Sequence, residues 1–381
     1  MILQSCTSSL VACNIYITSA ASAALPSLLS RAQDHCRQLR LMQQQQQRHS
    51  DGENKESNAA AAAIVHAYAD IPYDRSSFHL AGQSDCVAEV AIRLIQNALN
   101  EIELNNNKND PSNKKLEARH PYVGLVDHVA IMPIACQQFG TTPNTAAAIA
   151  AREIGSQIDQ LNSIKIHYYG LACPNNTPLA TVRRKTSFFN SGGAHDSSSS
   201  SSRGNNPEEQ TQTYEKGECT IGAPLHFVEN YNIRLTPNVD FGTAKTLTQA
   251  LRGRNIATKG IGVTGVEALT LPYNRHNIDH GGNVYEVACN LLEPKIGSVE
   301  KIEEELEKWI QKQKQQRSKD DDEDTNDLYN RSYFIEKAYR VGTTAQQCLS
   351  VLTNADEDNN YWLQQYDEQV LSRFNEFLGQ R

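Results

Sequence analysis

The segment at residues 119–135, RHPYVGLVDHVAIMPIA, places a histidine-proline pair and an aspartate-histidine pair at the start of an alternating apolar strand. Histidine, with an ordinary pKa of about 6.5, is the side chain best suited to accept and return a proton at neutral pH. His120 is therefore either a proton-transfer group or a loop residue without a chemical role. Asp127 either orients one of the two histidines or caps a turn where the strand begins.

The composition restricts the partners of such a group. The chain has 381 residues, 39% of them hydrophobic, which is enough for two modest domains with buried cores. Its formal net charge of −8 argues against nucleic acid or an anionic membrane as the main partner, since both attract basic surfaces. We expect a small-molecule ligand, and the sequence leaves a homodimer open.

Nine cysteines are spread along the chain without a CxxC pair or a Cys/His cluster at metal spacing. They predict reduced, mostly buried thiols, no metal site and a cytoplasmic protein. No apolar stretch reaches the roughly 20 residues that span a bilayer. The beginning of the chain resembles a signal peptide in its small residues, but its first basic residue is Arg31, so we expect a strand there and leave an organellar presequence open.

Strand and helix patterns alternate along the chain, which predicts an α/β fold. Four segments of biased composition, at 43–58, 105–115, 191–207 and 311–327, are interpreted as surface insertions because none can bury a core. The predicted strands are 10–18, 62–68, 77–81, 127–135, 164–170, 226–236, 266–271 and 283–293. The predicted helices are 25–42, 85–104, 240–252, 299–312, 361–378 and one that begins at Thr142-Pro143.

Apolar stripes predict which face of each helix is buried. The stripe of helix 85–104 consists of Val87, Val90, Leu94, Ala98 and Ile102. The helix after Thr142 presents Ile149, Ile154, Ile158 and Leu161, and the last helix presents Leu363, Tyr366, Val370, Phe374 and Phe377.

The strands alternate apolar and polar residues, so helices should cover one face of each sheet only. In strand 226–236, Tyr231, Ile233 and Leu235 share one face, whereas Asn230, Asn232 and Arg234 share the other. The polar faces either meet solvent, as in many antiparallel sheets, or line a polar tunnel between two domains.

Six blocks, in order, resemble the glutamate formiminotransferase family, and most closely its short plant and algal members that lack a cyclodeaminase half. The most specific block keeps the family spacing of His120-Pro121, Gly124, Asp127 and Pro133. The other blocks are LVACNIYIT, YDRSSFHLAG, YYGLACPNNTPLATVRRKTSFF, KGECTIGAPLHFVENYNI and HGGNVYEVACNLLEP with YFIEKAYRVG. The resemblance spans about residues 9–352.

The resemblance implies two subdomains, each a mixed β-sheet with helices on its outer face, whose sheets face each other across a folate tunnel. We expect the first at 9–190, a linker at 191–217, the second at 218–352 and a C-terminal helix at 353–381. The implied reaction, part of one-carbon metabolism and histidine catabolism, moves a formimino group from N-formimino-L-glutamate to N5 of tetrahydrofolate, without a metal. His120 matches the catalytic histidine of the family, with Asp127 beside it.

Substrate carboxylates call for local cations, and Arg75 and Arg183 occupy matching blocks. The resemblance also implies folate or substrate contacts at Tyr122, Lys216, Gly217, Gly222, Asn230 and Asn232. Tyr122 stands where the family usually has arginine after His-Pro, which puts the donor substrate in question. A folate-binding protein without turnover and a formyl transferase are the alternatives.

Overall fold

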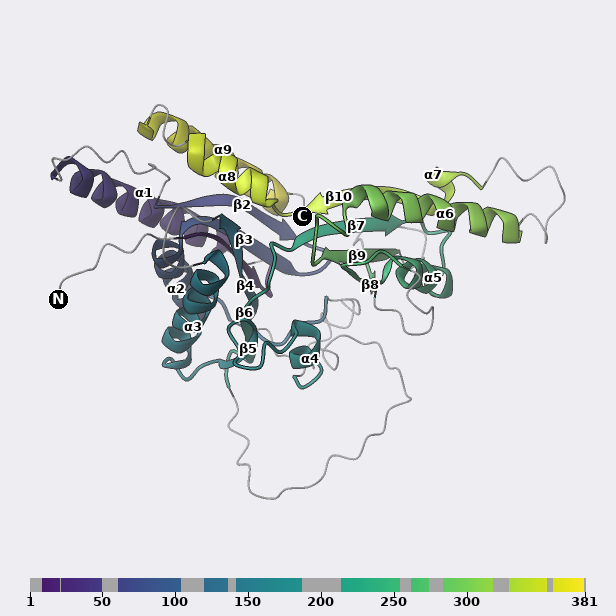
Figure 1. Cartoon of the computed structure of the whole chain (residues 1–381), viewed down its shortest axis with the longest axis horizontal. Helices are drawn as coiled ribbons and strands as arrows, with labels where there is room; N and C mark the ends of the chain where they lie inside the picture. The colour runs from purple at the N-terminus through teal and green to yellow at the C-terminus, as the bar shows by residue number, and fades with distance from the viewer. Residues whose placement is uncertain are drawn as a thin grey trace, which may run out of the picture. The chain divides into compact units, whose positions relative to one another are not determined.

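The computed structural model describes residues 9–20, 22–49, 61–103, 120–135, 142–186, 214–253, 262–273, 284–317, 329–354 and 359–379. The chain forms two compact units (Figure 1). The first unit contains Met1–Ala223 and Val351–Arg381, and the second contains Pro224–Ser350. Each unit has its own sheet and helices, which confirms the predicted α/β fold with two subdomains. The biased segments 105–115 and 191–207 lie outside the described residues.

A six-stranded mixed sheet forms the first unit, in the order β2-β3-β1-β4-β6-β5. The antiparallel part joins β2, β3, β1 and β4, while β6 pairs in parallel with both β4 and β5. Apolar and β-branched side chains alternate along these segments, which favours strands with one buried face. The strands are β1 (Leu10–Ile17), β2 (Ala62–Asp70), β3 (Arg75–Gln83), β4 (Val126–Ala135), β5 (Lys165–Gly170) and β6 (Glu218–Ala223).

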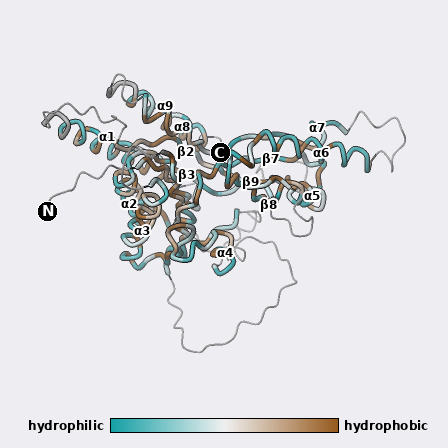
Figure 2. The backbone as a smooth tube through the Cα atoms, in the orientation of Figure 1, coloured by the Kyte–Doolittle hydropathy of each residue, from teal (hydrophilic) through white to brown (hydrophobic). Residues whose placement is uncertain are grey.

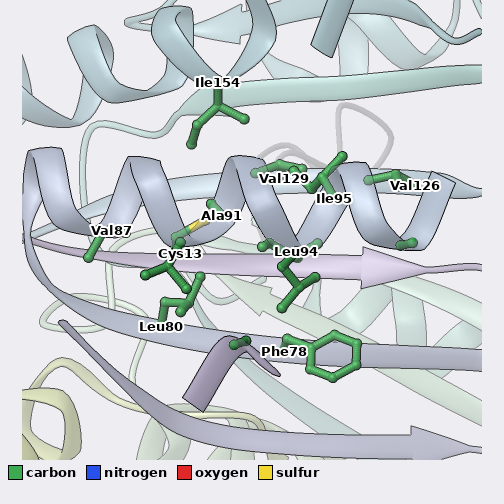
Figure 3. Close-up of a cluster of buried hydrophobic side chains, with 14 of the residues drawn as sticks. Cys13, Phe78, Leu80, Val87, Ala91, Leu94, Ile95, Val126, Val129 and Ile154 are labelled. Atoms are coloured by element: carbon green, nitrogen blue, oxygen red, sulfur yellow. The ribbon is translucent and has the colours of Figure 1, made fainter. Parts of the chain in front are cut away.

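Helices cover one face of this sheet and build its core. They are α1 (Leu25–His49), α2 (Ser84–Glu101), α3 (Pro143–Asp159) and α9 (Asn359–Gly379). Figure 3 shows Val87 and Leu94 of α2 directed at the sheet, near Cys13 of β1 and Leu80 of β3. The predicted stripe of α2 is confirmed, since all five of its residues are buried.

The stripe of α3 differs from the prediction. Ile149 and Leu161 are 49% and 41% exposed, whereas Ile154 and Ile158 are buried. Small residues make up most of the buried face instead, namely Ala146, Ala147, Ala148, Ala150, Ala151 and Gly155. Alanine lets the helix approach the sheet closely. A search for large apolar side chains therefore identified only Ile154 and Ile158 of the buried face. The predicted N-terminus is confirmed, because Thr142 accepts a hydrogen bond from the Thr145 amide.

The second unit is a four-stranded antiparallel sheet in the order β10-β7-β9-β8. Its strands are β7 (Glu229–Leu235), β8 (Val266–Pro272), β9 (Tyr285–Leu291) and β10 (Ile335–Val341). Tyr231, Ile233 and Leu235 are buried in a core with residues of α5 (Phe241–Leu251) and α6 (Val299–Arg317), as the alternation predicted. Figure 2 shows that α6 is otherwise largely hydrophilic along its length.

The boundary between the first and second units differs from the prediction. Glu218–Ala223, expected to begin the second subdomain, is strand β6 of the first sheet because it pairs with β4 and β5. The second unit therefore begins at Pro224. The chain then returns through α8 (Ala345–Asn354) to α9, which packs on β2 of the first unit, where Phe374 contacts Phe78 (Figure 1). Two short helices, α4 (Leu179–Arg183) and α7 (Arg331–Phe334), complete the described elements.

Candidate functional site

The face of the first sheet opposite its helical core carries polar and aromatic side chains. Strand alternation places Tyr16, Arg75 and Tyr169 there, because intervening residues such as Ile15 and Phe78 belong to the core. Asp127 and His128 are adjacent on β4 between the core residues Val126 and Val129, where the pairing with β1 shifts register. The central members come from four strands, the segment before β4 and the short helix α4, and we call them the sheet-1 cluster: Tyr16, Arg75, His120, Asp127, His128, Tyr169 and Arg183.

Arg75 begins β3 directly after a tight four-residue connection from β2. Asp74 ends this connection with φ of 49°, a left-handed conformation that aspartate tolerates better than most residues. Its Oδ1 accepts a hydrogen bond from the Ala20 amide at 2.9 Å. The connection therefore fixes the backbone position of Arg75, from which its side chain extends.

Asp127 is the buried anion of the cluster. Its Oδ1 accepts a hydrogen bond from the Val123 amide at 3.0 Å. Its Oδ2 accepts from Arg75 Nη2 at 2.8 Å and from Arg183 Nη2 at 3.3 Å. The Asp127 side chain is 1% exposed, and the two arginine side chains are 12% and 13% exposed. Two guanidinium groups thus share one carboxylate, so cationic groups outnumber anionic ones among the described residues of the cluster.

His120 lies against Arg75. Its Nδ1 is 2.7 Å from the Pro121 carbonyl oxygen, which can only accept, so Nδ1 carries the proton. Arg75 Nη1 lies 2.7 Å from Nδ1 and 3.0 Å from Nε2, and with the proton on Nδ1 only Nε2 can accept from it. The ring of Tyr73 packs edge-on against the imidazole. Burial and the nearby Arg75 charge hold the pKa of His120 well below its ordinary value. His120 is therefore a neutral imidazole at physiological pH.

Arg183 comes from α4, the short helix that follows β5. Burial lowers the pKa of its guanidinium, while the Asp127 carboxylate opposes that shift. A guanidinium still stays protonated at neutral pH. Arg183 therefore adds a permanent charge to the cluster from an element that is separate from the strands.

His128 stands between two tyrosine rings on the sheet surface. Its ring stacks on Tyr16 with centroids 5.7 Å apart and on Tyr169 with centroids 5.3 Å apart. Thr220 donates its hydroxyl proton to the Asp127 carbonyl oxygen, so the contact of its Oγ1 with His128 Nδ1 requires a proton on that nitrogen. Burial and the two arginines lower the pKa of His128 well below its ordinary value, so this imidazole is neutral as well.

Gly222 allows Tyr169 to reach His128. Tyr169 lies on β5, and β6 separates that strand from β4. A Cβ on Gly222 would lie 2.4 Å from the Tyr169 ring, which therefore needs a glycine beneath it. The structure thus places Gly222 next to the cluster, where it supports a protein side chain.

Lys216 and Gly217, predicted to contact folate, lie outside the cluster. The Lys216 ammonium donates to the Ile102 carbonyl oxygen at 3.1 Å, at the end of α2. Gly217 has φ of 79° and lies against Gly124, where a side chain would meet backbone atoms. Both residues thus have structural contacts that join β6 to its neighbours. Tyr122 is half-buried, two residues from His120.

Asn230 and Asn232 belong to the second unit, where both side-chain amides already have partners. Asn230 Nδ2 donates to Asn290 at 2.7 Å, and Asn232 Nδ2 donates to Glu286 at 2.7 Å. Glu286 is fully buried and also accepts from Arg234 Nε at 3.1 Å. We call Asn232, Arg234, Tyr273, Glu286 and Tyr339 the sheet-2 network.

The site predictions missed Tyr16 and Tyr169 and gave His128 no role. A signal existed in LVACNIYI, where Asn14 and Tyr16 share one face of an otherwise apolar strand. Their importance depends on which strands lie beside β1, and that order is not visible in the sequence.

A second surface feature lies away from the sheet-1 cluster. A polar groove between α2 and α3 contains none of the predicted residues and is lined by Asp85, Cys86, Glu89, Ile92, Arg93, Gln96, Asn97, Glu153 and Gln157. Within the described ranges, no group of three or more His, Cys, Asp or Glu side chains is arranged to hold a metal ion. In the same ranges, no helix combines the length and apolar character that crossing a membrane requires.

Comparison with known proteins finds one matching domain family and a relative with a similar sequence. Residues 33–224, just over half of the chain, match the model of the formiminotransferase domain, N-terminal subdomain. A formiminotransferase cyclodeaminase-like protein of Arabidopsis thaliana is 25% identical over 246 residues, which cover 61% of this chain and 73% of that protein.

Two solved structures align with the chain only weakly. The periplasmic protease PqqL from Escherichia coli aligns at 12% identity and a TM-score of 0.17, over 100% of this chain and 41% of that one. Pitrilysin aligns at 11% identity and a TM-score of 0.16, over 97% of this chain and 41% of that one. The chain thus spans less than half the length of either protein.

Proposed function

The chain belongs to the formiminotransferase family, and on that premise we propose that it moves a formimino group from N-formimino-L-glutamate to N5 of tetrahydrofolate. The observation that carries the proposal is a neutral imidazole, His120, held against Arg75, which shares the Asp127 carboxylate with Arg183. This arrangement supplies a proton acceptor and a cation for a carboxylate in one place. Tetrahydrofolate, the co-substrate, supplies the amine that receives the group.

His120 acts as the proton shuttle. The amine attacks the formimino carbon and becomes acidic once its new C–N bond has formed. His120 Nε2, to which Arg75 donates in the free protein, takes that proton once Arg75 has turned to the substrate carboxylate. The imidazolium that results is a strong acid because burial and Arg75 disfavour its charge. It returns the proton to the glutamate nitrogen, and the bond between that nitrogen and the carbon breaks.

Arg75 and Arg183 bind a substrate carboxylate through the excess positive charge of their shared site on Asp127. A bound carboxylate next to Arg75 offsets part of its charge and raises the pKa of His120 toward the ordinary value. The base therefore becomes stronger when the substrate is in place. Asp127 keeps both arginines directed at the site.

Substitution of His120 tests the assignment directly. His120→Ala should lower kcat for formimino transfer by roughly 10²–10⁴, because a placed general acid and base contributes about that much. Folate affinity should stay within a few-fold. His167→Ala is the matched control, since His167 is a half-buried histidine of β5 that pairs with Glu218 at 3.5 Å.

Unchanged turnover in His120→Ala would contradict the mechanism. Folate binding by the wild-type protein without turnover on formimino or formyl donors would instead identify a folate-binding protein. Turnover with a formyl donor alone would make it a formyl transferase.

A further inference from the structure

Tyr16 lies at the centre of the sheet-1 cluster without a place in the proposed chemistry. Its strand, β1, lies between β3 and β4. Tyr16 is opposite Ser77 of β3 on one side and opposite His128 of β4 on the other. The ring therefore meets the strand that carries Arg75 and the strand that carries Asp127.

The guanidinium of Arg75 rests on the Tyr16 ring. Its Cζ atom is 4.4 Å from the ring centroid, a distance at which the negative face of the ring attracts a cation. The same guanidinium uses Nη2 for Asp127 and Nη1 for His120. The ion pair alone leaves the planar group free to rotate about that one bond, whereas an aromatic face sets its plane.

The Tyr16 ring is itself held in place from several directions. It stacks on His128 at an interplanar angle of 24° and meets His79 edge-on at 71°. A ring fixed in this way can determine the orientation of a flexible arginine.

We propose that Tyr16 is a positioning residue that holds the Arg75 guanidinium against the His120 imidazole. The effect on catalysis rests on the proposed function, whereas the effect on His120 itself does not. The repulsion from Arg75 and the burial of the ring lower the pKa of His120, so releasing Arg75 raises that pKa. A residue that only filled space would leave the titration of His120 unchanged.

The second unit offers a matched control. Arg234 lies over the Tyr273 ring with its Cζ 3.7 Å from the centroid, which is the same type of contact in the sheet-2 network. Tyr273→Leu removes an arginine–tyrosine contact of the same type from the second unit.

The experiment is an NMR titration of the full chain with ¹³C-labelled histidine, in which His120→Gln assigns the His120 signal. Tyr16→Leu and Tyr16→Met should both move the His120 midpoint to higher pH, as should Arg75→Met. Tyr16→Phe, which keeps the ring, and Tyr273→Leu should leave it in place. Tyr16→Met is included because it fills a similar volume without an aromatic face.

Formimino transfer is measured on the same proteins. Tyr16→Leu should lower kcat roughly tenfold or more and shift the acid limb of the pH profile upward, since small misplacements of catalytic groups are costly. A wild-type midpoint in both Tyr16→Leu and Tyr16→Met would overturn the positioning role. Shifted midpoints in a protein without transfer would support positioning and refute the proposed function, so the two failures are distinguishable.

Discussion

The two sheets each carry a buried carboxylate on the face opposite their helical core, and the comparison of their surroundings separates a site from a scaffold. Asp127 in the first sheet is shared by two arginines, next to neutral histidines. Glu286 in the second sheet pairs with one arginine, Arg234, and accepts further hydrogen bonds from Asn232 and Tyr339. Among the described residues, the first arrangement sets two cations against one carboxylate, and the second sets one cation against one carboxylate.

This difference follows from the cost of burying charge. An unbalanced buried charge destabilises a protein unless a ligand or solvent compensates it, so it indicates a place where an anion binds. A balanced ion pair with every oxygen hydrogen-bonded is typical of a structural network. We therefore expect substitutions in the two regions to separate stability from substrate binding.

The largest difference is expected from removing one arginine in each region. Arg234→Met leaves Glu286 buried without a cation and should lower the free energy of unfolding by about 3–5 kcal/mol. Arg183→Met leaves the Asp127–Arg75 pair intact and should cost at most about 1–2 kcal/mol. It should also weaken the binding of an anionic folate about tenfold.

Urea unfolding of both variants, with a folate titration of Arg183→Met, gives the two quantities. Equal destabilisation by the two substitutions would show that Asp127 needs both arginines. The first region would then hold no spare charge, and the distinction between the regions would fail.

The next largest difference in stability is expected from adding a side chain at Gly222. Gly222→Ala puts a Cβ 2.4 Å from the Tyr169 ring and should cost about 1–3 kcal/mol, because the ring and β6 must move apart. In the second sheet, β9 carries Ala288 between Glu286 and Asn290, so that sheet accommodates a Cβ beside its network.

Urea midpoints measure this effect, with Gly379→Ala of α9 as the matched control because no atom lies near its Cβ position. The control should be neutral or slightly stabilising, since alanine favours helix. A Gly222→Ala protein as stable as the wild type would mean that the stack of Tyr169 on His128 is easily rearranged.

The sequence predicted the parts of this picture that depend on local pattern. The alternation of Tyr231, Ile233 and Leu235 gave the buried face of β7, and the threonine-proline pair gave the start of α3. The family spacing directed attention to Arg75, His120 and Asp127, and the structure brings Arg75 within hydrogen-bond distance of both other residues. Their proposed roles remain predictions.

Features that depend on distant pairing were beyond the sequence. Glu218–Ala223 is too short and too weakly patterned for its sequence to show which sheet it joins. Only its pairing with β4 and β5 assigns it to the first sheet. Tyr16 matters because β1 lies between β3 and β4. The buried face of α3 was predicted only in part, because most of it consists of alanines, whose small side chains give a weak hydrophobic pattern.

The smallest effect expected of a single residue is the loss of stability in acid that His66 causes. Burial and the Arg373 charge lower the pKa of His66 in β2 to about 4, against about 6.5 in an unfolded chain. Between these values the unfolded chain binds more protons, so the first unit loses stability as pH falls from 6.5 toward 4 and keeps it fully above 6.5. Allowing for partial solvation of His66, its share between pH 7 and pH 5 is about 1 kcal/mol.

His79, His120 and His128 shift in the same direction, so they add to the effect with the same sign. The sheet-2 network contains no histidine. Hydrogen exchange at pH 7 and pH 5, corrected for intrinsic rates, should therefore show protection falling in β3 and β4 while β7 and β9 change less. His66→Gln should reduce the fall, whereas substitution of the exposed His226 in the second unit should not. An equal loss of protection in both units would mean that buried neutral histidines do not distinguish them.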